Sequence, residues 1–203
     1  MKIRRTEGIC LDDKVTVNGF TWQKIMQLDQ ESSGSRAMCA KLRRAVGKAP
    51  GDSSDVWELT LQGAPEEWDS KAGKPSCEEW AVHTALTLYA LHRQGKTESV
   101  NAEGISFASA VGGFARKDGD RLEAVQRRFN AVATSVEFTE LAHHARGLVQ
   151  LLKANDMKMD YPRFAQDLFA FQKPGMTDRV RLRWGEDFYR AISKKNEKGG
   201  END

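Results

Sequence analysis

Two arginine-rich phrases contain the residues of this chain that are best suited to chemistry. They are residues 127–130 (Arg-Arg-Phe-Asn) and residues 178–189 (Asp-Arg-Val-Arg-Leu-Arg-Trp-Gly-Glu-Asp-Phe-Tyr). Both place arginines among aromatic and aliphatic residues at helical spacing, and neither has a nucleophile with a base beside it. Guanidinium groups match the geometry of phosphate oxygens. The phrases therefore predict a protein that holds a polyanion, not one that cuts or modifies a small molecule.

A third basic segment lies near the N-terminus, where residues 32–51 contain no acid. At 100° per residue, a helix over about Arg36–Val46 places Arg36 and Arg43 together on one side, with Arg44 next to them and apolar residues opposite. Such a helix can dock against a phosphate backbone. An ordinary solvated face is the alternative interpretation of the same pattern.

The later helices carry basic residues beside their apolar stripes. Arg121 and Arg128 are seven residues apart and flank the stripe of a helix over about residues 120–133. In the last helix, Arg179 and Arg183 share one face, whereas Arg181 falls near the apolar side. An arginine on a packing face needs a partner, which is a carboxylate, a neighbouring subunit or a phosphate.

The motifs of catalysis and metal binding are missing from the sequence. The adjacent His143 and His144 point about 100° apart on a helix, so they do not easily share one metal ion. No H-E-x-x-H or C-x-x-C motif is present. His83, on the apolar face of its helix, is interpreted as a core histidine with satisfied hydrogen bonds. We therefore expect no catalytic residue, no metal and no cofactor.

Composition favours a cytoplasmic protein with an uneven charge. Residues 1–113 hold 14 basic and 15 acidic side chains, whereas residues 114–195 hold 16 and 11, so the later part is the positive one. Three widely spaced cysteines (Cys10, Cys39 and Cys77) indicate reduced thiols. No apolar run approaches the roughly 20 residues of a membrane span, and no membrane partner is expected.

Hydrophobic periodicity predicts an all-α fold of two small antiparallel helical bundles packed into one elongated unit. The first bundle covers residues 1–104 and includes an acidic loop at 50–76. The second, basic bundle covers residues 105–195, and residues 196–203 form a disordered tail. The expected helices cover about residues 20–30, 36–46, 56–61, 78–93, 106 onward, 120–133, 137–154, 161–172 and 177–194. Gly112 and Gly113 are expected to weaken the fifth of these.

Several phrases, in order along the chain, resemble the small subunit CasB of the type I-E CRISPR surveillance complex Cascade. They are residues 80–92 (WAVHTALTLYALH), 127–130 (RRFN), 141–152 (LAHHARGLVQLL), 160–161 (DY) and 179–189 (RVRLRWGEDFY), with 35–37 and 42–45 resembling the family's first basic helix. The similarity extends over roughly residues 20–192. Each phrase alone is unspecific, and the ordered spacing carries the resemblance.

The resemblance implies an all-α, non-catalytic subunit that binds nucleic-acid backbone without sequence specificity and stabilises the R-loop and its displaced strand in antiviral defence. The implied partners are the guide CRISPR RNA, the target and displaced DNA strands, the Cascade backbone and large subunits, and a second copy stacked head to tail. Arg44, Arg128, Arg179 and Arg181 match the family's basic positions. The helical faces add Arg36, Arg43, Arg116, Lys117, Arg121 and Arg183.

The chain departs from the family pattern at three places. Ser109 replaces a basic residue, and residues 1–18 and the acidic loop are embellishments. Two alternatives stay open. One is a purely structural linker of a ribonucleoprotein, whose arginines pair with acidic neighbours and make no nucleic-acid contact. The other is an enzyme that uses His143 or His144 with nearby acids.

Overall fold

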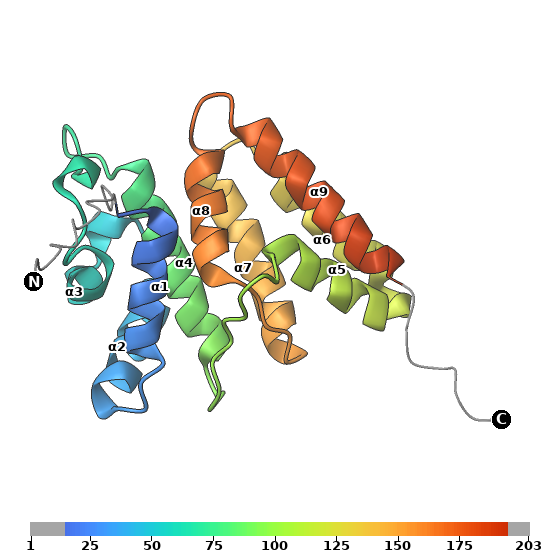
Figure 1. Ribbon diagram of the computed structural model, residues 1–203, viewed down its shortest axis with the longest axis horizontal. Helices are drawn as coiled ribbons and strands as arrows, with labels where there is room; N and C mark the ends of the chain where they lie inside the picture. Colours follow the sequence, from blue (N-terminus) through green and yellow to red (C-terminus); the bar gives the residue numbers. More distant parts are fainter. Residues whose placement is uncertain (1–14, 195–203) are drawn as a thin grey trace, which may run out of the picture.

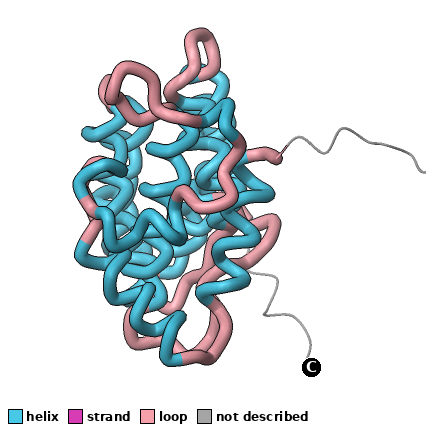
Figure 2. Tube along the Cα trace, turned by 90° about the vertical axis from the view of Figure 1, so that its left-hand side faces the viewer, coloured by secondary structure: helices cyan, strands magenta, loops and turns pink. Residues whose placement is uncertain are grey.

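The computed structural model describes residues 15–194, which contain nine α-helices, four short 3-10 helices and no β-strand. The all-α prediction is therefore confirmed, and Figure 2 shows only helices and loops. The helices are α1 (Val17–Leu28), α2 (Ser33–Arg44), α3 (Trp57–Thr60), α4 (Cys77–Arg93), α5 (Phe107–Lys117), α6 (Leu122–Thr134), α7 (Phe138–Ala154), α8 (Tyr161–Phe171) and α9 (Thr177–Ser193). The predicted tail at 196–203 and Cys10 lie outside the described residues.

Helix α4 lies at the centre of the molecule. It packs against α1 and α2 on one side and against α7 and α8 on the other, while α5 packs mainly on α9 (Figure 1). Ten consecutive residues of α4, numbers 81–90, are buried. The buried apolar side chains form one cluster that runs through both halves of the chain. The division into bundles at residues 104 and 105 stays a prediction.

Local side-chain caps explain where five of the nine described α-helices begin. Ser32 and Ser35 cap the start of α2 reciprocally, and the Asp160 carboxylate accepts from the Arg163 backbone N–H at the start of α8. Thr16 caps α1, which begins at Val17, three residues earlier than predicted. Residues 15–17 (Val-Thr-Val) alternate as a short strand would, yet they form the entry to a helix.

The sequence Thr134-x-x-Glu137 predicts a capping box at the start of α7, and this prediction is wrong. Thr134 and Glu137 form no capping box, because the Thr134 hydroxyl donates to the Asn130 carbonyl within α6. The Glu140 carboxylate accepts instead from the Val136 N–H, 3.0 Å away. An acid in the first turn of α7 therefore satisfies the free backbone donor, at a position one turn beyond the predicted one.

The glycines of α5 have a packing role. A Cβ on Gly112 would lie 2.4 Å from the carbonyl oxygen of Phe188 and 3.0 Å from the Cβ of Ala191. Only glycine permits this approach of α5 to α9. The predicted weakening of the helix by glycine is therefore offset by the α5–α9 interface. At its start, α5 is tied to α9 by the Ser106 hydroxyl, which donates to the Asp187 carboxylate at 2.7 Å.

The acidic segment after α2 is attached to the body of the protein. The predicted short helix is present as α3, but Trp68, in the expected surface loop, is buried and packs edge-on against Phe20 of α1. The Lys24 ammonium donates to the Gln62 carbonyl at 2.7 Å. The segment thus covers α1 and is only partly a surface loop.

Candidate nucleic-acid interface

Helix α2 presents two arginines that have no ion pair within the described residues. Its apolar side buries Cys39 and Leu42, and this leaves Arg36 exposed and Arg43 half-buried on the other faces. The two arginines are seven residues apart, so they lie about 10 Å apart along the helix axis. The faces predicted for Arg36 and Arg43 are thus found, and the two side chains line one cleft.

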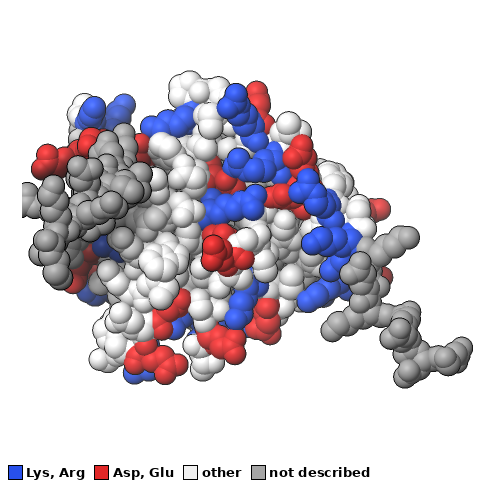
Figure 3. All heavy atoms as spheres, in the orientation of Figure 1, with Lys and Arg blue, Asp and Glu red and all other residues white. Residues whose placement is uncertain are grey.

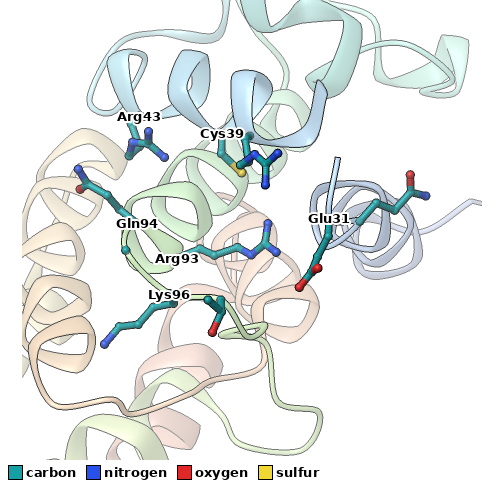
Figure 4. A pocket seen from close by; sticks show the side chains of 10 residues that line it. Glu31, Cys39, Arg43, Arg93, Gln94 and Lys96 are labelled. Carbon is teal, nitrogen blue, oxygen red and sulfur yellow. The ribbon is translucent and has the colours of Figure 1, made fainter. Parts of the chain in front are cut away.

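The cleft has a volume of about 430 Å³ and lies between α2, the end of α1 and the segment that follows α4. Figure 4 shows Arg43 and Cys39 projecting from α2, while Arg93 reaches into the cleft from the end of α4 and Lys96 lies on the adjoining loop. Four basic side chains and one acid, Glu31, therefore line it. Burial raises the pKa of the Cys39 thiol, which keeps this wall uncharged.

Two of these basic groups are held by internal partners. The Arg93 guanidinium pairs with Asp29 at 3.3 Å and donates to the Leu28 carbonyl, so it fixes the end of α1 against α4. Lys96 pairs with the exposed Asp156. The positive charge that remains available for a ligand comes mainly from the arginines of α2.

Lys153 of α7 extends this positive region. Partial burial lowers its pKa, and the positive charges of Arg43 and Lys96 lower it further. The Lys153 ammonium also donates to the Gln94 side-chain carbonyl at 2.8 Å, and Gln94 lines the cleft. Sequence reasoning missed Arg93, Lys96 and Lys153, because no periodic pattern connects three such distant segments.

The other predicted arginines and Lys117 differ in whether an internal partner holds them. Arg44 pairs with Asp55 at 3.5 Å and Arg121 with Asp118 at 2.9 Å. Both arginines are largely exposed, so the pairs add little stability and a phosphate can compete for them. Arg128 of α6 is exposed and forms no ion pair with a described residue.

Arg179 in the first turn of α9 is likewise exposed and forms no ion pair with a described residue. Helices α6 and α9 meet through the stacked rings of Phe129 and Phe188, whose centroids lie 4.1 Å apart. Neither Arg128 nor Arg179 lines the cleft. Figure 3 shows positive side chains along α9 and over α8 with negative ones between them.

Arg181 and Arg183 are bound to the fold. Arg181 has the partner that its position demanded: it donates to the Ser135 carbonyl at 2.7 Å, pairs with Asp178, and lies over the ring of Phe171. Arg183 pairs with the buried Asp167. Helical spacing would also allow Arg179 or Arg183 to pair with Glu186, but the described ion pairs do not include either pair.

Asp167 connects α8 to α9. Its carboxylate also accepts from the Trp184 indole N–H at 2.7 Å. Burial raises the pKa of this carboxyl, although the indole and the Arg183 charge oppose the shift. Arg183 is therefore a structural partner of this acid.

The last two predicted residues lie at the end of α5. Arg116 donates to the Lys194 carbonyl at 2.8 Å, and the Lys117 ammonium contacts the Met157 sulfur at 3.6 Å. Arg116 therefore fixes the end of α9. Lys117 is exposed and has no acidic partner among residues 15–194.

The histidines differ from expectation at one position. His83 is buried, as predicted, but neither ring nitrogen forms a hydrogen bond with a described residue. His144 lies 3.8 Å from Glu140, and the His143 ring packs edge-on against the His144 ring.

Between residues 15 and 194, no group of three or more His, Cys, Asp or Glu side chains could hold a metal ion. Within the same stretch, no helix is both long and apolar enough for a membrane span.

The geometry defines a class of protein: an all-helical domain with an arginine-lined cleft. The family model for CRISPR-associated protein Cse2 matches residues 38–189. The chain therefore belongs to the Cse2 family, which is also called CasB, and the predicted relationship is confirmed. Among curated proteins, none matches closely enough to count as a relative.

Solved structures share the fold. CasB from Thermobifida fusca is similar with a TM-score of 0.71 and 28% identity over 87% of this chain and 99% of that one. A Cse2-family CRISPR-associated protein from Thermus thermophilus gives 0.65 and 20%, over 87% and 99%. CasB from M. ruber gives 0.62 and 16%, over 89% and 96%.

Proposed function

We propose that this protein is a non-catalytic subunit of a Cascade-type CRISPR complex that binds the sugar-phosphate backbone of nucleic acid without reading sequence. The observation that carries the proposal is the pair Arg36 and Arg43, which lie in one cleft without described ion-pair partners. Lys153 adds charge to the same region, where Arg93 and Lys96 also lie with their acidic partners. Arg128 and Arg179 provide further exposed cations.

Such contacts would act on the balance of strand exchange. Replacing a DNA duplex by an RNA–DNA heteroduplex is nearly neutral in free energy, so protein contacts to the backbone can tip it. Arginines beside the displaced strand would lower the free energy of the open state. They would do so for any sequence, because phosphate contacts carry no sequence information.

The proposed partners are the guide CRISPR RNA, the target and displaced DNA strands, the Cascade backbone and large subunits, and a second copy of this chain stacked head to tail. Exposed apolar side chains in both halves support protein contacts. Trp22 and Met26 lie on α1, and Leu182 lies on α9. Each is exposed by half or more.

The test is binding of a fluorescent single-stranded oligodeoxythymidine to the purified protein over a range of salt concentrations. Each phosphate contact to a single strand contributes about 0.7 to the slope of log affinity against log salt. The double variant Arg36→Ala/Arg43→Ala should therefore bind more weakly and lose roughly 1.4 from that slope. An unchanged slope would overturn the assignment of the cleft.

A matched control removes the same charge elsewhere. Arg127→Ala/Lys158→Ala takes away two exposed cations that are paired with Glu123 and Glu98. Since neither residue lines the cleft, this variant should keep the salt slope of the unmodified protein. An equal loss of affinity in both variants would indicate a general charge effect and no defined cleft.

The structural linker is the second candidate. The observation in its favour is that Arg44, Arg121, Arg181 and Arg183 all pair with internal acids. Binding of a single strand by the isolated protein distinguishes the linker from the nucleic-acid-binding subunit. A linker would join the assembled complex, yet the isolated protein would show no salt-dependent affinity for a single strand.

A further inference from the structure

A second cavity, which we call the His83 pocket, lies where the end of α2 meets the middle of α4 and the first half of α7. Its volume is about 210 Å³. The lining includes His83, Thr84 and Trp80 of α4, Thr139 and Arg146 of α7, and Lys48 after α2. No acidic side chain lines it, whereas two exposed cations do.

His83 is the unexplained group of this pocket. The side chain is 2% exposed, and neither ring nitrogen forms a well-aligned hydrogen bond with a described residue, although the carbonyl groups of Ala45 and Lys48 lie near the ring. A buried polar group without a partner costs about 1–3 kcal/mol. Native proteins contain few such groups, and each calls for an explanation. A ligand that enters the pocket and bonds to the ring would provide one.

The charge state of the ring limits the ligand. Burial lowers the pKa of His83, although the nearby carbonyl groups of Ala45 and Lys48 and the charge of Asp52 favour the protonated form. The imidazole is therefore neutral at neutral pH and presents one donor and one acceptor. That pair complements the polar edge of an uncharged heterocycle better than it complements a bare phosphate.

The remaining walls agree with a flat ring. Trp80, Val46 and Leu88 supply apolar and aromatic surface, and a base stacked on such surface gains affinity whatever its sequence. The volume equals that of roughly seven water molecules, a space comparable to one nucleobase. Lys48 and Arg146 are exposed members of the lining, where the phosphates on either side of that base would lie.

The pocket and the arginine-lined cleft belong to one surface. Arg146 and Lys153 are seven residues apart on α7, so they share a face at about 10 Å separation. The Lys153 ammonium donates at 2.8 Å to Gln94, which lines the cleft, and Arg146 lines the pocket. The face of α7 that carries these two cations therefore connects the cleft to the pocket.

We propose that the His83 pocket accepts one unstacked base of a single-stranded nucleic acid whose backbone lies along α2 and α7. The proposal rests on the proposed function and adds a base-binding subsite to it. Recognition comes from the neutral imidazole, the threonine hydroxyls and the Trp80 ring. The flanking phosphates contact Lys48 and Arg146.

The experiment compares two probes with identical backbones: a 12-mer of deoxythymidine and the same 12-mer in which every nucleotide is abasic. The unmodified full-length protein should bind the base-bearing strand at least roughly fivefold more tightly. Equal affinity for the two strands, with ordinary salt dependence, would overturn the pocket and leave the proposed function intact. Absence of salt-dependent binding to either strand would overturn both.

Variants localise the preference. His83→Phe removes the donor and the acceptor of the ring at similar size and should lose most of the preference, whereas His83→Gln keeps a donor and an acceptor and should retain part of it. Trp22→Ala removes an exposed aromatic side chain outside the pocket and should retain all of it. A preference that survives His83→Phe, or that Trp22→Ala abolishes, would overturn the assignment. Thermal unfolding by circular dichroism confirms that each variant is folded.

Discussion

At the residue scale, the role of each arginine depends on the partner that the fold provides. Arg179 and Arg183 lie one helical turn apart on α9, yet Arg179 is exposed and Arg183 pairs with the buried Asp167. The sequence places both on one basic stripe. The carboxylate that distinguishes them comes from α8, and no local pattern indicates it.

This difference predicts unequal stability effects. Arg183→Ala leaves the Asp167 carboxylate buried with only the Trp184 indole as a partner. We expect a loss of about 1–3 kcal/mol in the free energy of unfolding, since Arg183 itself is partly exposed. Arg179→Ala should change it by less than about 0.5 kcal/mol. Urea unfolding measures both, and equal losses would contradict the distinction.

His92 gives the protein a pH-dependent stability. Its ring is 1% exposed, its Nδ1 lies 3.0 Å from the Tyr161 hydroxyl, and burial lowers its pKa to about 4. In the unfolded chain the His92 ring has a pKa of about 6.5. Between pH 6.5 and pH 4 the ring is therefore protonated in the unfolded chain and neutral in the folded protein. Stability should fall as the pH drops through this window, by up to roughly 3 kcal/mol from this residue.

The variant His92→Gln isolates that contribution. Glutamine does not titrate, so the free energy of unfolding of the variant should depend less on pH between 6.5 and 4 than that of the unmodified protein. Urea unfolding at several pH values provides the comparison. Parallel pH profiles would show that His92 is not the group responsible.

At the element scale, the adjacent glycines of α5 make opposite predictions. Gly112→Ala should destabilise the protein by about 1–3 kcal/mol, because the new Cβ meets the Phe188 carbonyl of α9 and forces the helices apart. Gly113→Ala should be neutral or stabilise by up to about 1 kcal/mol. Its nearest neighbour is the flexible Met157 side chain at 3.5 Å, and alanine favours the helix. Thermal unfolding of the two variants measures both effects, and equal shifts of the unfolding midpoint would contradict the packing argument.

The helices could be predicted from sequence wherever their boundaries are local. Ser32 and Asp160 cap the helices that follow them, and both caps can be recognised in the sequence because the partner lies within three residues. Gly112 shows the limit. A glycine is needed at this position because the backbone of α9, more than seventy residues later in the chain, packs against it. Within its own helix, Gly112 indicates only a weaker helix.

The candidate site could be predicted only in part for the same reason. The absence of acids around α2 indicated Arg36 and Arg43 directly. Arg93, Lys96 and Lys153 join them only because α4 and α7 pack side by side. His83 was expected to be a satisfied core histidine, and its lack of hydrogen bonds depends on where three elements meet.

At the scale of the whole molecule, the exposed arginines of the second half should matter in the assembled complex. We predict that Arg128→Ala/Arg179→Ala weakens retention of target DNA while the subunit still joins the complex, because both side chains are exposed and removed from the core. Gel-shift assays on complexes reconstituted with guide RNA measure retention, and size exclusion measures assembly. Normal retention, or loss of assembly alone, would refute the role of these arginines.

Helix α1 has a consequence for how this family is delimited. The family match begins at residue 38, but Phe20, Ile25 and Leu28 of α1 are fully buried and the helix covers α4 and α8. The Tyr89 hydroxyl and Arg93 both hold Asp29 at its end. A fragment that starts at residue 38 would expose the surfaces of α4 and α8 that α1 covers. The range matched by the family model is therefore shorter than the packed unit of this chain.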